Sequence, residues 1–108
     1  MSKRTEQVSE LVQREVSQIL TREIEPPKGT LITIMGAEVT PDLRYVKIFV
    51  SILPESKTGS ALSVLKRNTR EVQRLLNQRM TMKFSPHIVW EIDLTNVKYA
   101  AIDDALNK

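Results

Sequence analysis

The sequence predicts an α+β fold in the order α-β-β-α-β, with a three-stranded mixed sheet covered by helices on one face. Three observations lead to this prediction. Apolar residues recur at helical spacing over residues 5–24 and 60–81. Between these ranges, one segment alternates strictly between apolar and other residues, as a half-buried strand does. A helix then separates the second strand from the third, which is the connection that a parallel pairing requires.

The first helix is predicted from its apolar stripe and from the stop signal after it. "PPKG" follows residues 5–24, and proline ends a helix because it has no N–H to donate and clashes with the carbonyl one turn back. The chain therefore turns at residues 26–29. The apolar residues of the stripe are Val8, Leu11, Val12, Val16, Ile19, Leu20 and Ile24.

Two strands joined as a hairpin follow this turn. "TLITIMGAEVT" is rich in β-branched residues, and "TPDL" supplies proline and aspartate at positions suited to a turn. "RYVKIFVSIL" is the second strand, and its alternating apolar residues are Val46, Ile48, Val50 and Ile52. Gly36 breaks the alternation of the first strand, so we expect a β-bulge there.

The second half of the chain completes the sheet. "PESKTGS" is a predicted loop before the helix at residues 60–81, and "HIVWEIDL" after Pro86 is the predicted third strand. "AAIDDALN" is expected to form a short terminal helix. No long linker interrupts the chain, and its 108 residues suit a single domain over residues 1–108.

Composition limits the compartment and the class of protein. Apolar residues make up 41% and charged residues 27%, which is typical of a folded globular protein. Cysteine is absent, no apolar run is long enough to cross a bilayer, and the start "MSKRTEQVSE" lacks a signal-peptide core. We therefore expect a cytoplasmic monomer with no membrane partner, or an organellar stroma or matrix protein if the chain is a processed form.

Positive charge is concentrated in one stretch, residues 65–84, with six basic residues and one acid, Glu71, although the whole chain has a net charge of only +3. Four of the cations fall on the helix side opposite the apolar Leu62, Leu65, Val72 and Leu76, and no acid is expected within their arc: Lys66, Arg67, Arg70 and Arg74. Guanidinium groups bind phosphate through paired, charge-assisted hydrogen bonds, so these four are the RNA-binding candidates. The simpler interpretation is a solvated face that keeps the protein soluble. Arg79 and Lys83, near or beyond the expected helix end, are weaker candidates.

The predicted second strand offers another candidate RNA surface. Tyr45, Lys47 and Phe49 lie on its side away from the helices, in an aromatic-cation-aromatic row on which bases can stack. The structural alternative is that these aromatic residues pack against their neighbours on the sheet, with Trp90 covering them.

The sequence gives no positive evidence for enzymatic chemistry. His87 is the only histidine and cysteine is absent, so a zinc site is not expected. The three glycines, Gly29, Gly36 and Gly59, lie too far apart for a phosphate-binding loop. We therefore predict no catalytic residue, no metal, no cofactor and no small-molecule substrate.

Three segments in order resemble the ribosome-binding factor A family of small-subunit assembly factors: "ILTREIEPPKG", "EVTPDLRYVKIFVSIL" and "SPHIVWEID". The resemblance runs from about Val8 to Leu106. It implies a type II KH-like domain, α-β-β-α-(kink)-α-β, with an ordered core at about 5–106 and no Gly-x-x-Gly loop. The family has an Ala-x-Gly kink where this chain has Asn68-Thr69-Arg70, so we expect only a mild kink near Asn68.

The resemblance also implies a function. The chain would bind the immature small (30S) ribosomal subunit and its rRNA, and would support late maturation without catalysis. This includes 5′-end processing of the 16S rRNA and a role in the cold. Two alternatives are a general single-stranded RNA or DNA binder using Tyr45 and Phe49, and a protein-interaction domain whose first helix pairs with a partner helix.

Overall fold

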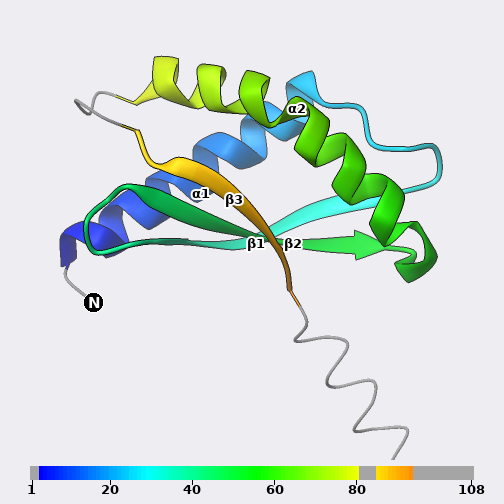
Figure 1. The fold of residues 1–108 in the computed structure, drawn as a ribbon, viewed down its shortest axis with the longest axis horizontal. Helices are drawn as coiled ribbons and strands as arrows, with labels where there is room; N and C mark the ends of the chain where they lie inside the picture. The colour runs from blue at the N-terminus through cyan, green and yellow to red at the C-terminus, as the bar shows by residue number, and fades with distance from the viewer. Residues whose placement is uncertain (1–2, 81–84, 94–108) are drawn as a thin grey trace, which may run out of the picture.

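A computed structural model describes residues 3–80 and 85–93. The elements follow the predicted order: α1 (Lys3–Glu23), β1 (Leu31–Val39), β2 (Tyr45–Leu53), a short 3₁₀ helix η1 (Glu55–Lys57), α2 (Thr58–Arg79) and β3 (His87–Ile92) (Figure 1). The α+β prediction is therefore confirmed. The expected terminal helix "AAIDDALN" lies outside the described residues.

The helix α1 packs through the predicted stripe and ends before the two prolines. Its buried side chains include Val8, Val12, Val16 and Ile19. The following turn is closed by a hydrogen bond from Thr30 N to Pro27 O of 3.0 Å. Gly29 has a φ of 76° in this turn, a conformation that residues with a Cβ adopt at a cost.

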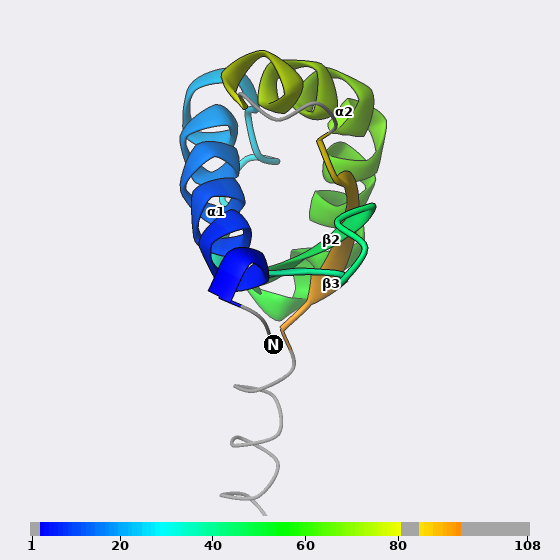
Figure 2. The same cartoon turned by 90° about the vertical axis from the view of Figure 1, so that its left-hand side faces the viewer.

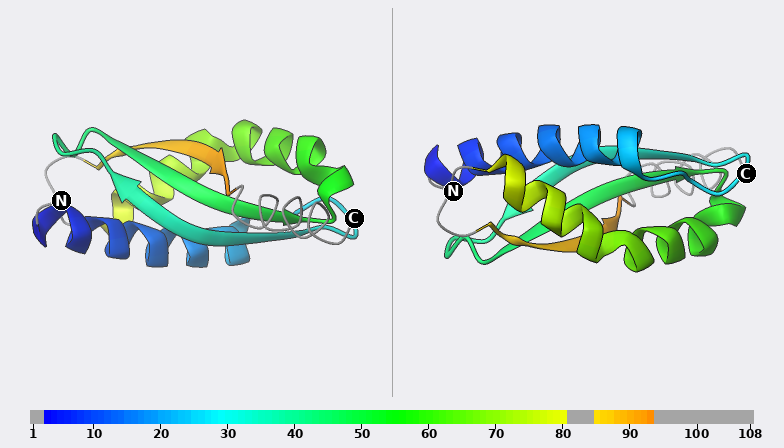
Figure 3. Two further views of the ribbon diagram at one scale, coloured as in Figure 1. Left: turned by 90° about the horizontal axis from the view of Figure 1, so that it is seen from below. Right: turned by 90° about the horizontal axis from the view of Figure 1, so that it is seen from above.

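The sheet has the order β1-β2-β3 and is mixed, as predicted. β1 and β2 pair antiparallel, and their register shifts between Ile34 and Gly36, which confirms the expected bulge. β3 pairs parallel with β2, so that Val46 lies opposite Ile88. Figure 3 shows the sheet in front from below and the helices in front from above, which places both helices on the same face.

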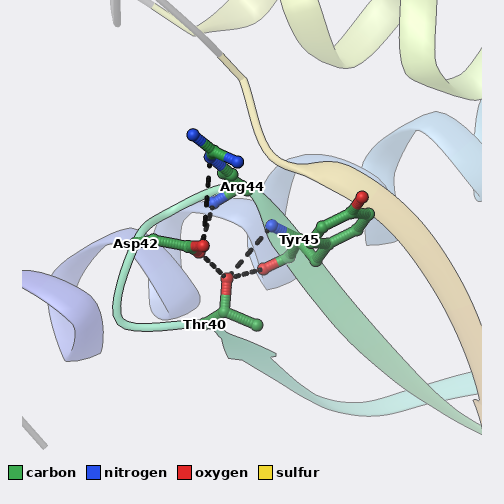
Figure 4. Close-up of polar contacts among 4 residues, drawn as sticks. All are labelled: Thr40, Asp42, Arg44 and Tyr45. Atoms are coloured by element: carbon green, nitrogen blue, oxygen red, sulfur yellow. Dashed lines mark hydrogen bonds and ion pairs between the residues drawn. The ribbon is translucent and has the colours of Figure 1, made fainter.

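The hairpin tip is closed by a small polar network (Figure 4). The Thr40 hydroxyl donates to Asp42 Oδ1 over 2.6 Å, and the same carboxylate oxygen accepts from the Arg44 amide over 3.1 Å. The Thr40 hydroxyl also accepts from Tyr45 N over 3.1 Å. The hydrogen bond from the Thr40 hydroxyl, followed by that from the Arg44 amide, lowers the pKa of Asp42. Leu43 has a φ of 62°, which is unusual for a residue with a branched side chain.

The core lies between the sheet and the two helices. The alternating residues of β2 are buried as predicted, and α2 contributes Ala61, Leu65, Val72 and Leu76. Figure 2 shows α1 along one side of the molecule and α2 running from the top to the other side. One buried polar bond joins α1 to the sheet, because Ser9 Oγ accepts from Val39 N over 3.1 Å.

The helix α2 is continuous from Thr58 to Arg79, so the structure shows no break at Asn68, where a mild kink was expected. The ribbon of α2 changes direction along its length in Figures 1 and 3. Asn68 donates to Val64 O and Thr69 donates to Leu65 O, each over 2.8 Å. Side chains that bond to the carbonyl one turn back are known to bend helices, which gives this bend a physical cause.

Candidate nucleic-acid interface

The solvent side of α2 carries three cations with no internal partner. Lys66, Arg67 and Arg70 are exposed, and the structure gives them no hydrogen bond or ion pair within residues 3–80 and 85–93. Their positions follow from the helix, because Leu65 and Val72 on the opposite side are fully buried. These three charges are therefore available to an external anion.

Arg74 differs from the other three predicted cations because it is already paired. It bonds through two guanidinium nitrogens to the carboxylate of Glu71, with Nε to Oε2 at 3.0 Å. The hydrogen bond from Arg74 lowers the pKa of Glu71, and the same bond raises the pKa of Arg74. The expectation that no acid lies within the cationic arc is therefore wrong, since a carboxylate three positions earlier reaches the guanidinium.

A shallow groove runs beside these cations, between α2 and β3. Its lining includes Thr69, Arg70, Glu71, Gln73, Arg74, Asn77, His87 and Ile88. His87 is exposed at the start of β3, and its ring lies 5.9 Å from that of Tyr45 at an interplanar angle of 44°. The groove therefore has guanidinium groups on its helix side and the ring of His87 on its strand side.

Gln73 holds the two sides of the groove together. Its Nε2 donates to Pro86 O over 2.9 Å, and its Oε1 accepts from Ile88 N over 2.9 Å. Nε2 also reaches Asn77 Oδ1 over 3.1 Å. The amide of Gln73 thus pairs with a backbone carbonyl and a backbone N–H at the start of β3. Because β3 is an edge strand of the sheet, no neighbouring strand supplies these partners on that side.

Arg79, one of the weaker candidates, lies apart from this surface. Arg79 Nη1 bonds to Glu15 Oε2 over 3.0 Å and to Gln18 Oε1 over 3.1 Å, so its charge joins α2 to α1. Lys83 lies outside the described residues.

Tyr45, Lys47 and Phe49 lie on the outer sheet face, away from the helices. Lys47 is opposite Glu38 in the pairing of β1 with β2. The suggestion that Trp90 covers these aromatic residues is wrong. Trp90 pairs with Ile48 on the helix side, and its Nε1 donates to Thr69 Oγ1 over 2.8 Å.

Sequence reasoning missed the groove because its members come from distant segments. Gln73 and Asn77 are four positions apart on one helix, a spacing that places them on one side. Nothing in their identity indicates that the start of β3 lies beside them. His87 is exposed, and its ring contact with Tyr45 depends on the parallel register of β2 and β3.

No group of three or more histidine, cysteine, aspartate or glutamate side chains that could hold a metal ion occurs in the described residues. Neither described helix combines the length and apolar character needed to cross a membrane.

The element order, the mixed sheet and the exposed cationic helix define a KH-like α+β domain with an open, basic surface. A profile of the ribosome-binding factor A family matches residues 4–106. The ribosome-binding factor A of Acetivibrio thermocellus is 33% identical over 107 residues, which cover 97% of this chain and 87% of that protein. This chain belongs to the ribosome-binding factor A family.

Solved structures of the family share the fold. The crystal structure of ribosome-binding factor A from Thermus thermophilus has a TM-score of 0.72 at 18% identity, covering 82% of this chain and 94% of that one. A homology model of the Thermus thermophilus factor, fitted into a cryo-electron microscopy map of its complex with the 30S subunit, has a TM-score of 0.67 at 20% identity. It covers 79% of this chain and 90% of that one.

Proposed function

We propose that this protein binds the immature small ribosomal subunit by laying the solvent side of α2 against rRNA. It would thereby support late maturation, including processing of the 5′ end of 16S rRNA. Family membership supports the choice of partner, as does the 30S complex of the Thermus thermophilus factor. The observation that carries the proposal is the set of three unpaired cations, Lys66, Arg67 and Arg70, on one exposed helix side.

The proposed contacts are mainly to phosphate. Lys66 and Arg67 neutralise backbone charge, and Arg70 does so at the edge of the groove. Arg74 contributes less than an unpaired arginine because Glu71 already occupies its guanidinium and offsets its charge. Phosphate contacts fix position and orientation but carry no base sequence, so the shape of the folded rRNA supplies the selectivity.

The action proposed is binding without catalysis, by a monomer in the cytoplasm. A basic helix binds some arrangements of the RNA strands more tightly than others. The difference between these binding free energies stabilises the preferred arrangement. That effect is sufficient to favour a conformation in which processing enzymes reach the 5′ end.

The two alternatives receive less support from the geometry. A single-strand binder using Tyr45 and Phe49 would place phosphates near Glu91, and the charge of Lys47 on the same sheet face is offset by Glu38 opposite it. A partner helix pairing with α1 would need an apolar side, but the apolar stripe of α1 is buried in the core.

The test is co-sedimentation with purified small subunits across a salt series. Replacing Lys66, Arg67 and Arg70 with glutamine should reduce the slope of log affinity against log salt by about 2 to 3, because each phosphate contact releases about 0.7 to 0.9 counterions. A matched control replaces the exposed Lys3, Arg22 and Lys28 with glutamine, which removes the same net charge elsewhere.

Comparing the two variants distinguishes binding through the proposed surface of α2 from binding through the net positive charge of the protein. Equal loss of binding in both would reduce the effect to net charge and contradict the proposed surface. The maturation step is tested separately, by mapping the 5′ end of 16S rRNA in cells that carry the triple variant in place of their own family member. Accumulation of unprocessed ends is expected with this variant and not with the control.

A further inference from the structure

The outer face of the sheet is an exposed apolar surface that the RNA-binding proposal leaves unused. We define it by the residues that point away from the helices on β1, β2 and β3. All five large apolar side chains that are exposed within the described ranges belong to it, with exposed fractions of 40–59%: Leu31, Met35, Tyr45, Leu53 and Val89. Figure 3 shows this face in front in the view from below. Apolar patches of this kind on small proteins mark interaction sites more often than scattered exposed residues do.

The dimensions of the outer face restrict what can cover it. β1 and β2, each about 30 Å long, and β3, about 20 Å long, present roughly 300 to 400 Å² at a strand spacing of about 4.8 Å. A stable interface between two folded proteins needs about 800 Å² from each partner, so a second copy of this chain would be held too weakly. A single α-helix, about 10 Å across, matches the width of the strip.

The charges of the outer face indicate the chemistry of that helix. Glu38 lies opposite Lys47, and Glu91 lies opposite Phe49 with no partner within the described residues. The face thus combines its apolar side chains with the polar Thr33 and Ser51, and it has one acid in excess. It repels phosphate and favours a cation beside the apolar contacts.

We propose that the outer face binds an amphipathic helix of a partner protein, with apolar side chains along one side and lysine or arginine at its flanks. The helix would lie along β2, with its apolar side on Tyr45 and Leu53 and a cation beside Glu91. The cationic side of α2 faces away from the sheet, because the opposite side of α2 is packed into the core. The protein therefore holds RNA and a protein helix on opposite faces at the same time.

The experiment uses model peptides, so its result does not depend on whether the ribosomal proposal is correct. The probe is a Leu/Lys amphipathic peptide of about 18 residues, or about 27 Å as a helix, and the matched peptide replaces every Lys with Glu. Methyl resonances of Leu31, Met35, Leu53 and Val89 report contact directly in carbon-proton correlation spectra of the full chain. We expect these methyl signals to shift with the Leu/Lys peptide, which should bind at least about tenfold more tightly than the Leu/Glu peptide.

A pair of variants locates the site. Replacing Leu31 and Leu53, which face each other across β1 and β2, with lysine should weaken binding of the Leu/Lys peptide at least about tenfold. Ser63→Lys adds a charge on exposed α2 and should leave this binding unchanged. Circular dichroism establishes that each variant is folded.

Several results would overturn the proposal. These are shifts confined to α1 or α2, equal or tighter binding of the Leu/Glu peptide, and full binding by the Leu31 and Leu53 variant. Shifts of the same methyl groups with a single-stranded oligonucleotide would assign the face to RNA instead. Self-association through this face, detected by sedimentation without peptide, would assign it to a second copy.

Discussion

The side chain of Gln73 joins α2 to β3, so substituting it measures how much one side-chain amide contributes to the free energy of unfolding. Substitution by alanine removes the donor to Pro86 O and the acceptor of Ile88 N. Each such bond contributes about 1 kcal/mol net, and a backbone N–H left unpaired in a buried site costs about 1 to 3 kcal/mol. Ile88 is 8% exposed, so water replaces the lost partner poorly. We expect Gln73→Ala to lower the free energy of unfolding by about 2 to 3 kcal/mol.

Urea unfolding measures this loss, and two further variants isolate its cause. Gln73→Met keeps the length of the side chain but removes its hydrogen bonds, so it should lose nearly as much stability as the alanine variant. Gln78→Ala makes the same change at an exposed position of the same helix and should lie within about 0.5 kcal/mol of the parent. Amide exchange of Ile88 should accelerate in the Gln73 variants relative to that of Asp93, whose amide bonds to Val50 O over 2.8 Å.

If Gln73→Met is as stable as the parent protein, or if the loss in Gln73→Ala stays below about 0.5 kcal/mol, the two hydrogen bonds contribute nothing measurable. The stability of the edge strand would then come from apolar packing alone.

Three other predictions follow from single contacts. Glu71→Gln should free Arg74, and the slope of log affinity against log salt for small subunits should increase by about 0.7 to 0.9 in a co-sedimentation series. The pKa of Asp42 is lowered in the folded state. Its ionised form therefore stabilises the fold at pH values above the ordinary aspartate pKa of about 3.9. This stabilisation is lost as the pH falls through the lowered pKa of the folded protein. Asp42→Asn should therefore lower the thermal midpoint at neutral pH, and the two thermal midpoints should converge in acid. Ser9→Ala leaves the buried amide of Val39 unpaired and should cost about 1 to 3 kcal/mol in urea unfolding.

The spacing of apolar residues along the chain predicted most of the fold, because each helix and strand buries one apolar side in the core. The alternation from Val46 to Ile52 identified the central strand, and all four alternating residues are buried. The helix between β2 and β3 predicted a parallel pairing, which the register confirms. Element ends differ by only a few residues from the predicted ranges, since proline and glycine mark them in the sequence.

The incorrect expectations concern which neighbour a side chain meets. Alternation within β3 places Trp90 on the same face as Ile88 and Ile92, so its helix-side position was available from the sequence and was overlooked. The pairing of Glu71 with Arg74 was likewise implied by their helical spacing.

The position of Arg79 beside α1 has a different origin. It depends on how two helices cross, and no local pattern contains that information.

The parallel pairing of β2 with β3 also determines an order of assembly. Val39 pairs with Val46, seven positions away, whereas Tyr45 pairs with His87, which lies 42 positions further along the chain. Loop-closure entropy alone makes the second contact more costly by about 1.6 kcal/mol, before α2 forms and shortens the distance. We therefore expect the hairpin to form early and β3 to join last.

A chain paused before that last step would already present the cations of α2 and would lack the strand that completes the groove. Such an intermediate would bind polyanions without selectivity. The docking of β3 is thus the folding step that completes the groove beside the basic helix α2. Slow docking of this strand would be visible as a late phase in the fluorescence of Trp90.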